Sequence, residues 1–328
     1  MESEPKKTEE RIHRDTKWPN VLFYIYLHMS AIYGVFLIFT HAYWKTTFLS
    51  FFLTSLGLFS VTAGCHRLWA HRTYEAVWPL RLALVIFQTL VCQGPVYDWV
   101  LDHRLHHKHH GTEEDPYNHK KGFFYGYLGN RLVTQNPKID ELKAKIDMSD
   151  IEDDQIVMWQ KRLYWIMMPL FSILLPINAP VEYWGESILV SVFVVGFLRV
   201  TLCLHGAWMV NTAFLVWGLD PLNKRSADTN LVFLVNKSLW PQYHYLLPWD
   251  YQSGEYGTYG AGCTTAFIRI FTVLGLVDRL KTIDSRGVRS ALGQTAKTGK
   301  PLLECLQMSQ DILTGPHFVP AAAEDDPV

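Results

Sequence analysis

Long apolar stretches constrain the fold of this chain more than any other feature of its 328 residues. A bilayer is crossed by a helix of about 20 predominantly apolar residues. A helix also satisfies its own backbone hydrogen bonds in lipid, where water cannot. The sequence therefore predicts an all-α integral membrane protein with four transmembrane helices, which cover about residues 21–43, 46–65, 163–179 and 186–217.

The charge balance excludes one large class of function. The chain has 30 Lys and Arg against 31 Asp and Glu, so its formal net charge is −1. Charged residues make up 19% of the chain, below the roughly 25% that is usual in soluble domains. A strongly basic nucleic-acid-binding surface is therefore not expected, and no nucleic acid is predicted as a partner. The five cysteines are scattered and odd in number, which predicts reduced thiols.

The distribution of Lys and Arg orients the predicted spans. Residues 1–20 and the long loop 66–162 are rich in both, whereas the link near Lys45 and the link 180–185 have almost none. Since positive residues favour the cytosolic side, both termini are predicted to be cytosolic. The long loops 66–162 and 218–285 would then form a cytosolic cap on the membrane domain 21–285.

Three further segments complete the predicted organisation. Residues 1–20 form a cytosolic N-terminal segment. Residues 77–92 are apolar, but Pro79 and Arg81 interrupt them, so we expect a re-entrant or interfacial helix there. Residues 286–328 are polar and poor in aromatics, which predicts a loose C-terminal tail.

Most residues with catalytic potential are histidines. His103, His106 and His107 have offsets of three and four, so a helix carries all three rings on one face, and neutral imidazole is a common ligand for transition metals. His66 and His71 are five residues apart, which is about 140° of rotation on a straight α-helix. These two rings are not expected to share one small ligand position, but they could flank a site that holds two ions.

The remaining histidines have simpler interpretations. His109, His110 and His119 are expected in a solvated loop. His205 lies in an apolar helix, where packing or a bond to a neighbour is expected rather than metal ligation. Arg199 lies within the fourth predicted span, and because a bare charge at mid-bilayer is costly, it is expected to face the interior of the bundle or to mark the end of the helix.

The histidine segments resemble those of a known family, the membrane acyl-CoA desaturases of the stearoyl-CoA desaturase type. The resemblance covers roughly residues 17–285. The stretches that carry it are HRLWAHR, DWVLDHRLHHKHH and EEDPYNHKKGFFYGYLG, which resemble the first two histidine boxes, and WPNVLFYIYLHMSAIYG, VMWQKRLY, WGESILVSVFVVGFLRV and LPWDYQSGEYG.

The resemblance implies a function and a set of partners. Two irons held by histidines would activate O₂ and insert a cis double bond into a saturated fatty acyl-CoA. Electrons would come from cytochrome b5 and its reductase, in the endoplasmic reticulum membrane. The resemblance leaves open whether the chain forms a homo- or hetero-oligomer with desaturase chains. The resemblance implies metal ligands at His66, His71, His103, His106, His107 and His244, with Asn211 acting through a water.

The third box departs from the family pattern. Where the family has HNYHH, this chain has PQYHY at residues 241–245. Pro241 and Tyr245 replace the first and last histidines of the box, and His244 is retained. The family also has NSAAH on the fourth span, where Leu215 takes the place of the histidine. Three of nine histidine ligands are thus replaced, which predicts fewer than two tightly held irons and strongly lowered desaturation. The alternative is a metal-deficient pseudoenzyme that binds acyl-CoA or regulates an active desaturase.

The residues that the resemblance assigns to substrate are retained. They would line the acyl tunnel or approach the CoA, whose phosphates suit a cationic edge. For the Lys–Arg pair and the tryptophans, anchoring at the membrane interface is the competing interpretation. The positions are Asn20, Gln93, Trp99, Arg104, Lys161, Arg162 and Trp208.

The predicted topology can be tested at a glycosylation sequon. Asn236, Lys237 and Ser238 match the acceptor pattern, but a cytosolic segment never meets the lumenal transferase. We therefore expect Asn236 to be unmodified. A glycosidase-sensitive mass shift that is absent from Asn236→Gln would contradict the four-span topology.

Overall fold

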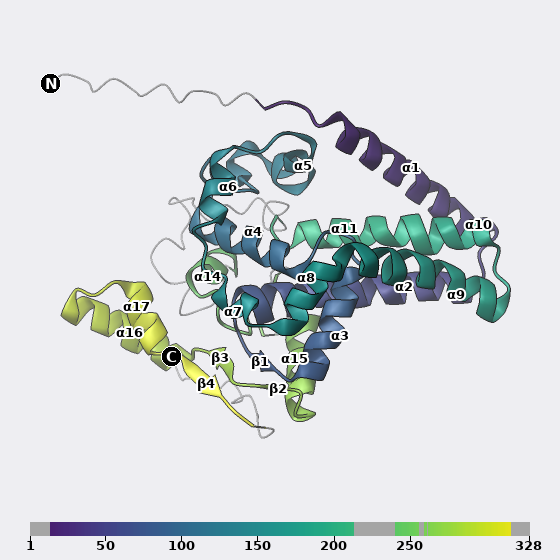
Figure 1. The fold of residues 1–328 in the computed structure, drawn as a ribbon. Helices are drawn as coiled ribbons and strands as arrows, with labels where there is room; N and C mark the ends of the chain where they lie inside the picture. The colour runs from purple at the N-terminus through teal and green to yellow at the C-terminus, as the bar shows by residue number, and fades with distance from the viewer. Residues whose placement is uncertain (1–13, 213–239, 256–258, 261, 316–328) are drawn as a thin grey trace, which may run out of the picture.

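The computed structural model describes residues 14–212, 240–255, 259–260 and 262–315 (Figure 1). Four helices in this part of the chain are long and apolar enough to cross a membrane, which confirms the predicted all-α membrane fold. They cover Trp18–Thr40, Trp44–Ala70, Gln155–Trp184 and Ile188–Met209.

The four spans are built from shorter helical segments. Helix α1 is Trp18–Thr40, and the second span joins α2 (Trp44–Phe59) to the π-helical segment η1 (Ser60–Ala70). The third span comprises α8 (Gln155–Met168), the π-helical η4 (Pro169–Leu174) and α9 (Leu175–Trp184). The fourth comprises α10 (Ile188–Ser191), the π-helical η5 (Val192–Leu198) and α11 (Arg199–Met209).

The spans differ from their predicted bounds mainly in the third. It begins at Gln155 instead of 163, and Pro169 and Pro176 do not interrupt it. Both prolines sit in the first positions of a helical segment, and the wider π-helical turn accommodates the missing backbone donor. The predicted end of the fourth span, at 217, lies outside the described residues, as do Leu215 and the Asn236 sequon.

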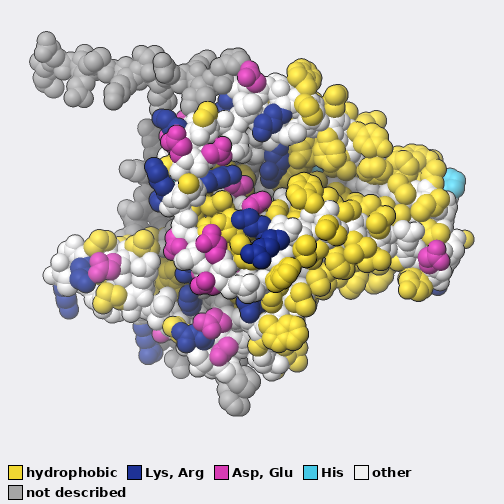
Figure 2. Space-filling model, viewed as in Figure 1, with side chains coloured by type: hydrophobic (Ala, Val, Ile, Leu, Met, Phe, Trp, Pro, Cys, Tyr) yellow, Lys and Arg dark blue, Asp and Glu magenta, His cyan; other side chains and the backbone are white. Residues whose placement is uncertain are grey.

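The surface agrees with a bilayer around one part of the molecule. Large apolar side chains cover the outward faces of the spans in Figure 2, while Lys, Arg, Asp and Glu gather at the other end. On α1 the exposed residues are almost all apolar, among them Phe23, Ile32 and Phe39, the last of which is 83% exposed. Apolar patches of this size on a soluble protein would be a liability, but in lipid they are the expected surface.

The elements between and after the spans form a head region, defined here as residues 71–154 and 240–315 (Figure 1). Its apolar α3 (Trp78–Thr89) has 12 residues, too few to span. The other helices are α4 (Val96–Lys108), η2 (His119–Lys121), η3 (Tyr125–Gly129), α5 (Asn130–Leu132), α6 (Lys138–Lys143), α7 (Ser149–Glu152), α14 (Trp240–Leu246) and α15 (Cys263–Val273).

The predicted loose tail is wrong for its first part. Helices α16 (Ser285–Thr298) and α17 (Leu302–Met308) are ordered, and strand β4 (Asp311–Leu313) pairs with β3 (Leu280–Thr282). A second small antiparallel pair joins β1 (Glu75–Ala76) to β2 (Val277–Asp278). The segment is polar on average, yet its few apolar residues fall on one face and bury a small core that includes Val288, Ala291, Cys305 and Leu306.

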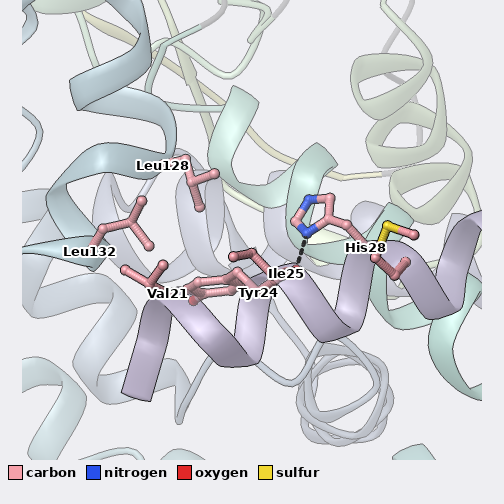
Figure 3. A pocket seen from close by; sticks show the side chains of 7 residues that line it. Val21, Tyr24, Ile25, His28, Leu128 and Leu132 are labelled. Atoms are coloured by element: carbon pink, nitrogen blue, oxygen red, sulfur yellow. Dashed lines mark hydrogen bonds between the residues drawn. The ribbon is translucent and has the colours of Figure 1, made fainter. Parts of the chain in front are cut away.

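A chain of polar side chains joins α1 to α11 inside the membrane region. His28 Nε2 lies 2.9 Å from His205 Nε2, and His28 Nδ1 lies 2.5 Å from the carbonyl oxygen of Tyr24. The hydroxyl of Tyr127 contacts His205 Nδ1. His28 also borders an apolar groove of about 320 Å³ between α1 and the segment around Leu128 (Figure 3). The prediction that His205 bonds to a neighbour is confirmed.

Arg199 is fully buried in the bundle, as its position in the span predicted. Its guanidinium donates to the carbonyl oxygens of Leu90 and Val195, and to the carbonyl and hydroxyl of Ser172. In the described part of the chain its hydrogen-bond partners are therefore oxygens of the backbone and of a hydroxyl. These oxygens stabilise the charge and tie three segments together.

Gly34 tests the packing of α1 against η5. A Cβ atom at this position would lie 2.5 Å from the carbonyl oxygen of Phe193, which is the close helix approach that small residues allow in membranes. We expect Gly34→Ala to lower the free energy of unfolding by about 1–3 kcal/mol, because the clash outweighs the gain in helix propensity. Gly293→Ala, in α16 with open space around it, is the matched control and should be neutral or stabilising. Equal unfolding midpoints in detergent for the two variants would contradict this packing.

Candidate metal centre

A π-helical turn brings the first two histidines together. The amide of His71 donates to the carbonyl of His66 at 3.1 Å, a bond between residues five apart, within and just beyond η1. Their ring centroids are consequently 4.8 Å apart. The expectation that these two rings cannot share one ligand position is therefore wrong, because it assumed a regular α-helix.

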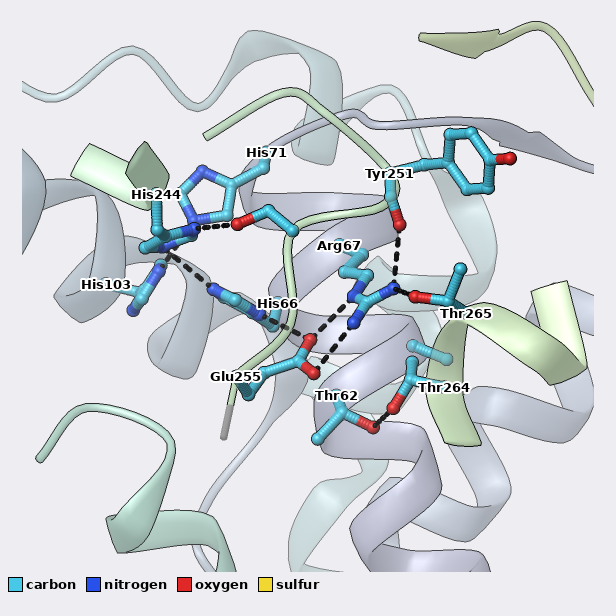
Figure 4. Close-up of polar contacts among 12 residues, drawn as sticks. Thr62, His66, Arg67, His71, His103, His244, Tyr251, Glu255, Thr264 and Thr265 are labelled. Carbon is cyan, nitrogen blue, oxygen red and sulfur yellow. Dashed lines mark hydrogen bonds and ion pairs between the residues drawn. The ribbon is translucent and has the colours of Figure 1, made fainter. Parts of the chain in front are cut away.

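Four histidines from three parts of the chain converge at the end of the second span. One ring nitrogen from each of His66, His71, His103 and His244 lies within 4.8 Å of the others (Figure 4). The Nε2 atoms of His71 and His103 are 2.8 Å apart, and those of His66 and His244 are 3.3 Å apart. His107 joins this group, since its Nε2 lies 3.2 Å from that of His244. We call these five residues the imidazole cluster.

The outer nitrogens of the cluster have oxygen partners that fix the rings. His66 Nδ1 lies 3.0 Å from Glu255 Oε1, and His103 Nδ1 lies 2.8 Å from Asn211 Oδ1. An ionised carboxylate and an amide oxygen can only accept, so both Nδ1 atoms donate. Their Nε2 atoms then point into the cluster, which is the ring orientation that a metal cation requires.

The surroundings keep the cluster neutral. Burial, followed by repulsion from neighbouring imidazoles, lowers the pKa of His71, His103, His107 and His244 well below the usual 6.5. The rings therefore stay unprotonated at physiological pH, and their lone pairs are available to a metal. The residues present fit an ion such as iron, which favours imidazole nitrogen among protein ligands.

A buried ion pair anchors the cluster to the second span. Arg67 donates to both oxygens of Glu255, at 2.6 and 2.8 Å, and also to the carbonyl of Tyr251 and the hydroxyl of Thr265 (Figure 4). Burial alone would raise the pKa of Glu255, but Arg67 and His66 together lower it to about 2. Neither Arg67 nor Glu255 was identified from the sequence; the only available signal is a charged pair beside a histidine box and the GEYG stretch.

His106 does not join the imidazole cluster, although it shares helix α4 with His103 and His107. Its Nδ1 lies 2.7 Å from Asp115 Oδ1, and its Nε2 lies 2.8 Å from the hydroxyl of Tyr245. Burial would raise the pKa of Asp115, but His106 and backbone N–H groups lower it. The three histidines predicted for one helical face are thus divided between two environments, because they point to different sides of the cluster.

His110 also differs from its expected solvated position. Its ring lies against that of Tyr245, with centroids 3.8 Å apart. One nitrogen from His106 and His110 and one oxygen from Asp115 form a second group of closely spaced donor atoms. Pro241 lies in α14, together with His244 and Tyr245.

Four of the predicted substrate residues lie on α4 and α8, and three of these contact other side chains or the backbone. The Trp99 indole stacks on the His103 ring at 4.8 Å. Arg104 donates to Asp150 and to backbone carbonyls, so its charge is already paired. Lys161 lies over the ring of Tyr97 at 3.2 Å.

The remaining predicted substrate residues are dispersed. Asn20 donates to the carbonyl of Arg131 at 2.8 Å, and Trp208 packs under the Arg131 guanidinium. Gln93 has a buried Nε2 with no hydrogen-bond partner among the described residues, and Arg162 is exposed. The structure thus brings five of the six predicted histidine ligands together but does not gather the seven substrate positions at one point.

Comparison with known proteins gives consistent relatives. No protein-family model matches the chain. It is 41% identical to the acyl-CoA Delta12-desaturase of Acheta domesticus over 293 residues. This alignment covers 88% of this chain and 82% of that relative. The chain is also 41% identical to the acyl-CoA Delta-9 desaturase of the same organism, over 85% of this chain and 79% of that one. The human stearoyl-CoA desaturase is 35% identical over 85% of this chain and 78% of its own length.

Glu255→Gln tests the anchoring of the cluster. The substitution leaves the Arg67 charge buried without its carboxylate, so we expect a loss of about 3–5 kcal/mol in the free energy of unfolding and a 10- to 100-fold weaker metal affinity. Because the folded pKa of Glu255 is depressed, the contribution of this carboxylate is complete above pH 4.5 and is lost as the pH falls towards 2.

The matched control is Glu75→Gln, which removes a carboxylate that is paired with Arg279 at the surface. This change should cost less than about 1 kcal/mol. Thermal unfolding and competition with a chelator measure the two effects. Similar values for the two variants would contradict the anchoring role of Glu255.

Proposed function

Because the chain belongs to the membrane acyl-CoA desaturase family, we propose that it is an oxidoreductase that inserts a cis double bond into the hydrocarbon chain of a fatty acyl-CoA. The observation that carries the proposal is the buried imidazole cluster, whose Nε2 atoms converge within hydrogen-bonding distances of one another. A cluster of neutral imidazoles at the end of a membrane span fits a metal-dependent reaction on a lipid substrate.

The chemistry divides between the metal and the protein. Iron, when bound, would activate O₂, the oxidant that removes hydrogen from an unactivated methylene, a reaction that protein side chains cannot perform. The protein holds the ligands neutral through burial, and Glu255 and Asn211 orient His66 and His103. The Trp99 indole, stacked on His103, would exclude water from the side where the acyl chain approaches.

The substrate positions retain suitable chemistry. Lys161 and the exposed Arg162 would offer cations to the CoA phosphates, and Arg162 lies on the side of α8 opposite the buried Tyr164. The buried Nε2 of Gln93, without a partner among the described residues, would donate to a polar group of the substrate. Asn20, Arg104 and Trp208 would shape the path between them.

The cellular setting follows from the same family. We assign the protein to the endoplasmic reticulum membrane, with both termini and the head region on the cytosolic side. Electrons would then come from cytochrome b5 and its reductase at that surface. The proposed domain plan is an N-terminal segment 1–20 and a desaturase domain 21–285, followed by the C-terminal unit that contains α16 and α17.

A second function is favoured by one contact. The hydroxyl of Tyr245 lies 2.8 Å from His106 Nε2, so a side chain occupies the lone pair that a metal ligand needs. A chain with this change could bind acyl-CoA, or regulate an active desaturase, without desaturating. This pseudoenzyme function is the alternative against which the first is tested.

Lipid profiling in a desaturase-deficient host separates the two functions. We expect the natural chain to give a low but measurable amount of cis-unsaturated product, because loss of even outer partners of a metal ligand costs tenfold or more. His66→Ala should abolish the product. The combined reversion Leu215→His, Pro241→His and Tyr245→His should raise it by at least about tenfold, whereas single reversions should do little because ligands act as one unit.

The control is Cys263→Ala, which replaces an exposed thiol and should leave the product unchanged at equal protein levels. No product from either the natural chain or the triple reversion, together with retained binding of a radiolabelled acyl-CoA, would contradict the desaturase and favour the pseudoenzyme.

A further inference from the structure

The surroundings of His106 differ from those of the imidazole cluster in one respect, which is the occupation of the ring nitrogens. Asp115 Oδ1 accepts from His106 Nδ1 at 2.7 Å and also from the backbone amide of Tyr117 at 2.8 Å. Asp115 Oδ2 accepts from the amide of Gly111 at 3.0 Å. A carboxylate with these donors is an acceptor only, so His106 Nδ1 donates to it.

The second ring nitrogen of His106, Nε2, is occupied by Tyr245, whose phenol oxygen lies 2.8 Å away. Metal ligation by His106 would need this same nitrogen. In the imidazole cluster, by contrast, the Nε2 atoms face other Nε2 atoms at 2.8–3.3 Å, an arrangement of lone pairs that a cation stabilises.

The ring of Tyr245 also fills the space beside His106. Its centroid lies 3.8 Å from that of His110, 5.0 Å from that of His107 and 5.8 Å from that of His106. At 3.8 Å and 35° between planes, the His110 ring packs over the face of the phenol. The Tyr245 ring is thus in contact with His106, His107 and His110 at the edge of the imidazole cluster.

We infer that the described residues of this protein bind one metal ion, in the imidazole cluster, and that the side chain of Tyr245 keeps His106 out of that site by bonding to its Nε2. The ligands available to the single ion are His66, His71, His103, His107 and His244. The inference deepens the proposed function, on which it rests only for the choice of iron.

Metal content and spectroscopy test the inference without any measurement of desaturation. The full-length protein in detergent is loaded anaerobically with iron, unbound iron is removed, and iron per chain is measured together with X-ray absorption. We expect one equivalent, nitrogen ligands and no iron–iron scattering. His244→Ala should reduce the iron content at least tenfold, whereas His106→Ala should leave it at one equivalent.

Tyr245→Phe is the decisive variant, because it keeps the ring and removes only the hydroxyl. It should retain one iron, and the oxidised natural protein should lack the visible charge-transfer band of an iron(III) phenolate. Tyr245→His should bind additional, weaker iron if His106 is released. Two equivalents with iron–iron scattering in the natural protein would overturn the inference. A phenolate band in the natural protein that disappears in Tyr245→Phe would overturn it as well, and so would loss of iron in that variant. Either result would make Tyr245 a ligand.

These outcomes are independent of the proposed function. One iron per chain with no unsaturated product would support the inference and contradict the desaturase. Two irons per chain with robust unsaturated product would contradict the inference and support the desaturase. Thermal unfolding of each variant checks that a change in iron content comes from the site and not from misfolding.

Discussion

The ion pair between Arg67 and Glu255 connects the membrane domain to the candidate site. Arg67 lies near the end of the second span, and both oxygens of Glu255 accept from its guanidinium, while one also accepts from His66. Burying two charges is costly unless they are paired and hydrogen-bonded, and here the carbonyl of Tyr251 and the hydroxyl of Thr265 accept from Nη1 of the guanidinium. The pair thus fixes Tyr251, Glu255 and Thr265 against the second span and sets the orientation of His66.

The geometry of the imidazole cluster depends on this anchor because Glu255 orients the His66 ring. Burial and mutual repulsion lower the pKa of His71, His103, His107 and His244, and Asn211 accepts from His103 Nδ1 on the outer side. His106 has other partners on both ring nitrogens, since Nδ1 lies against Asp115 and Nε2 against the hydroxyl of Tyr245. These two contacts set His106 apart from the nitrogens that face one another in the cluster.

Polar groups inside the membrane region have a different role. Arg199 donates to carbonyl oxygens of the backbone, and His205 is joined to His28 and Tyr127. In lipid an unpaired polar group costs several kcal/mol, so these side chains are retained with partners that link helices. These polar contacts stabilise the packing of the spans, and they include no member of the imidazole cluster.

The sequence by itself determined the spans and predicted the five histidines that form the imidazole cluster. Hydropathy is a local property, so the four apolar stretches were sufficient to predict four helices, and the spacing of the histidine segments was sufficient for the resemblance to the desaturases. Only the tertiary structure decided that His66 and His71 share one site, because this depends on a π-helical turn. It also separated His106 from His103 and His107, because Asp115 and Tyr245 reach it from distant positions. The order of α16 and α17 was missed for a related reason: a few apolar side chains stabilise a polar segment only when another surface buries them. Contacts between segments far apart in sequence, which no local pattern records, set the geometry of the site.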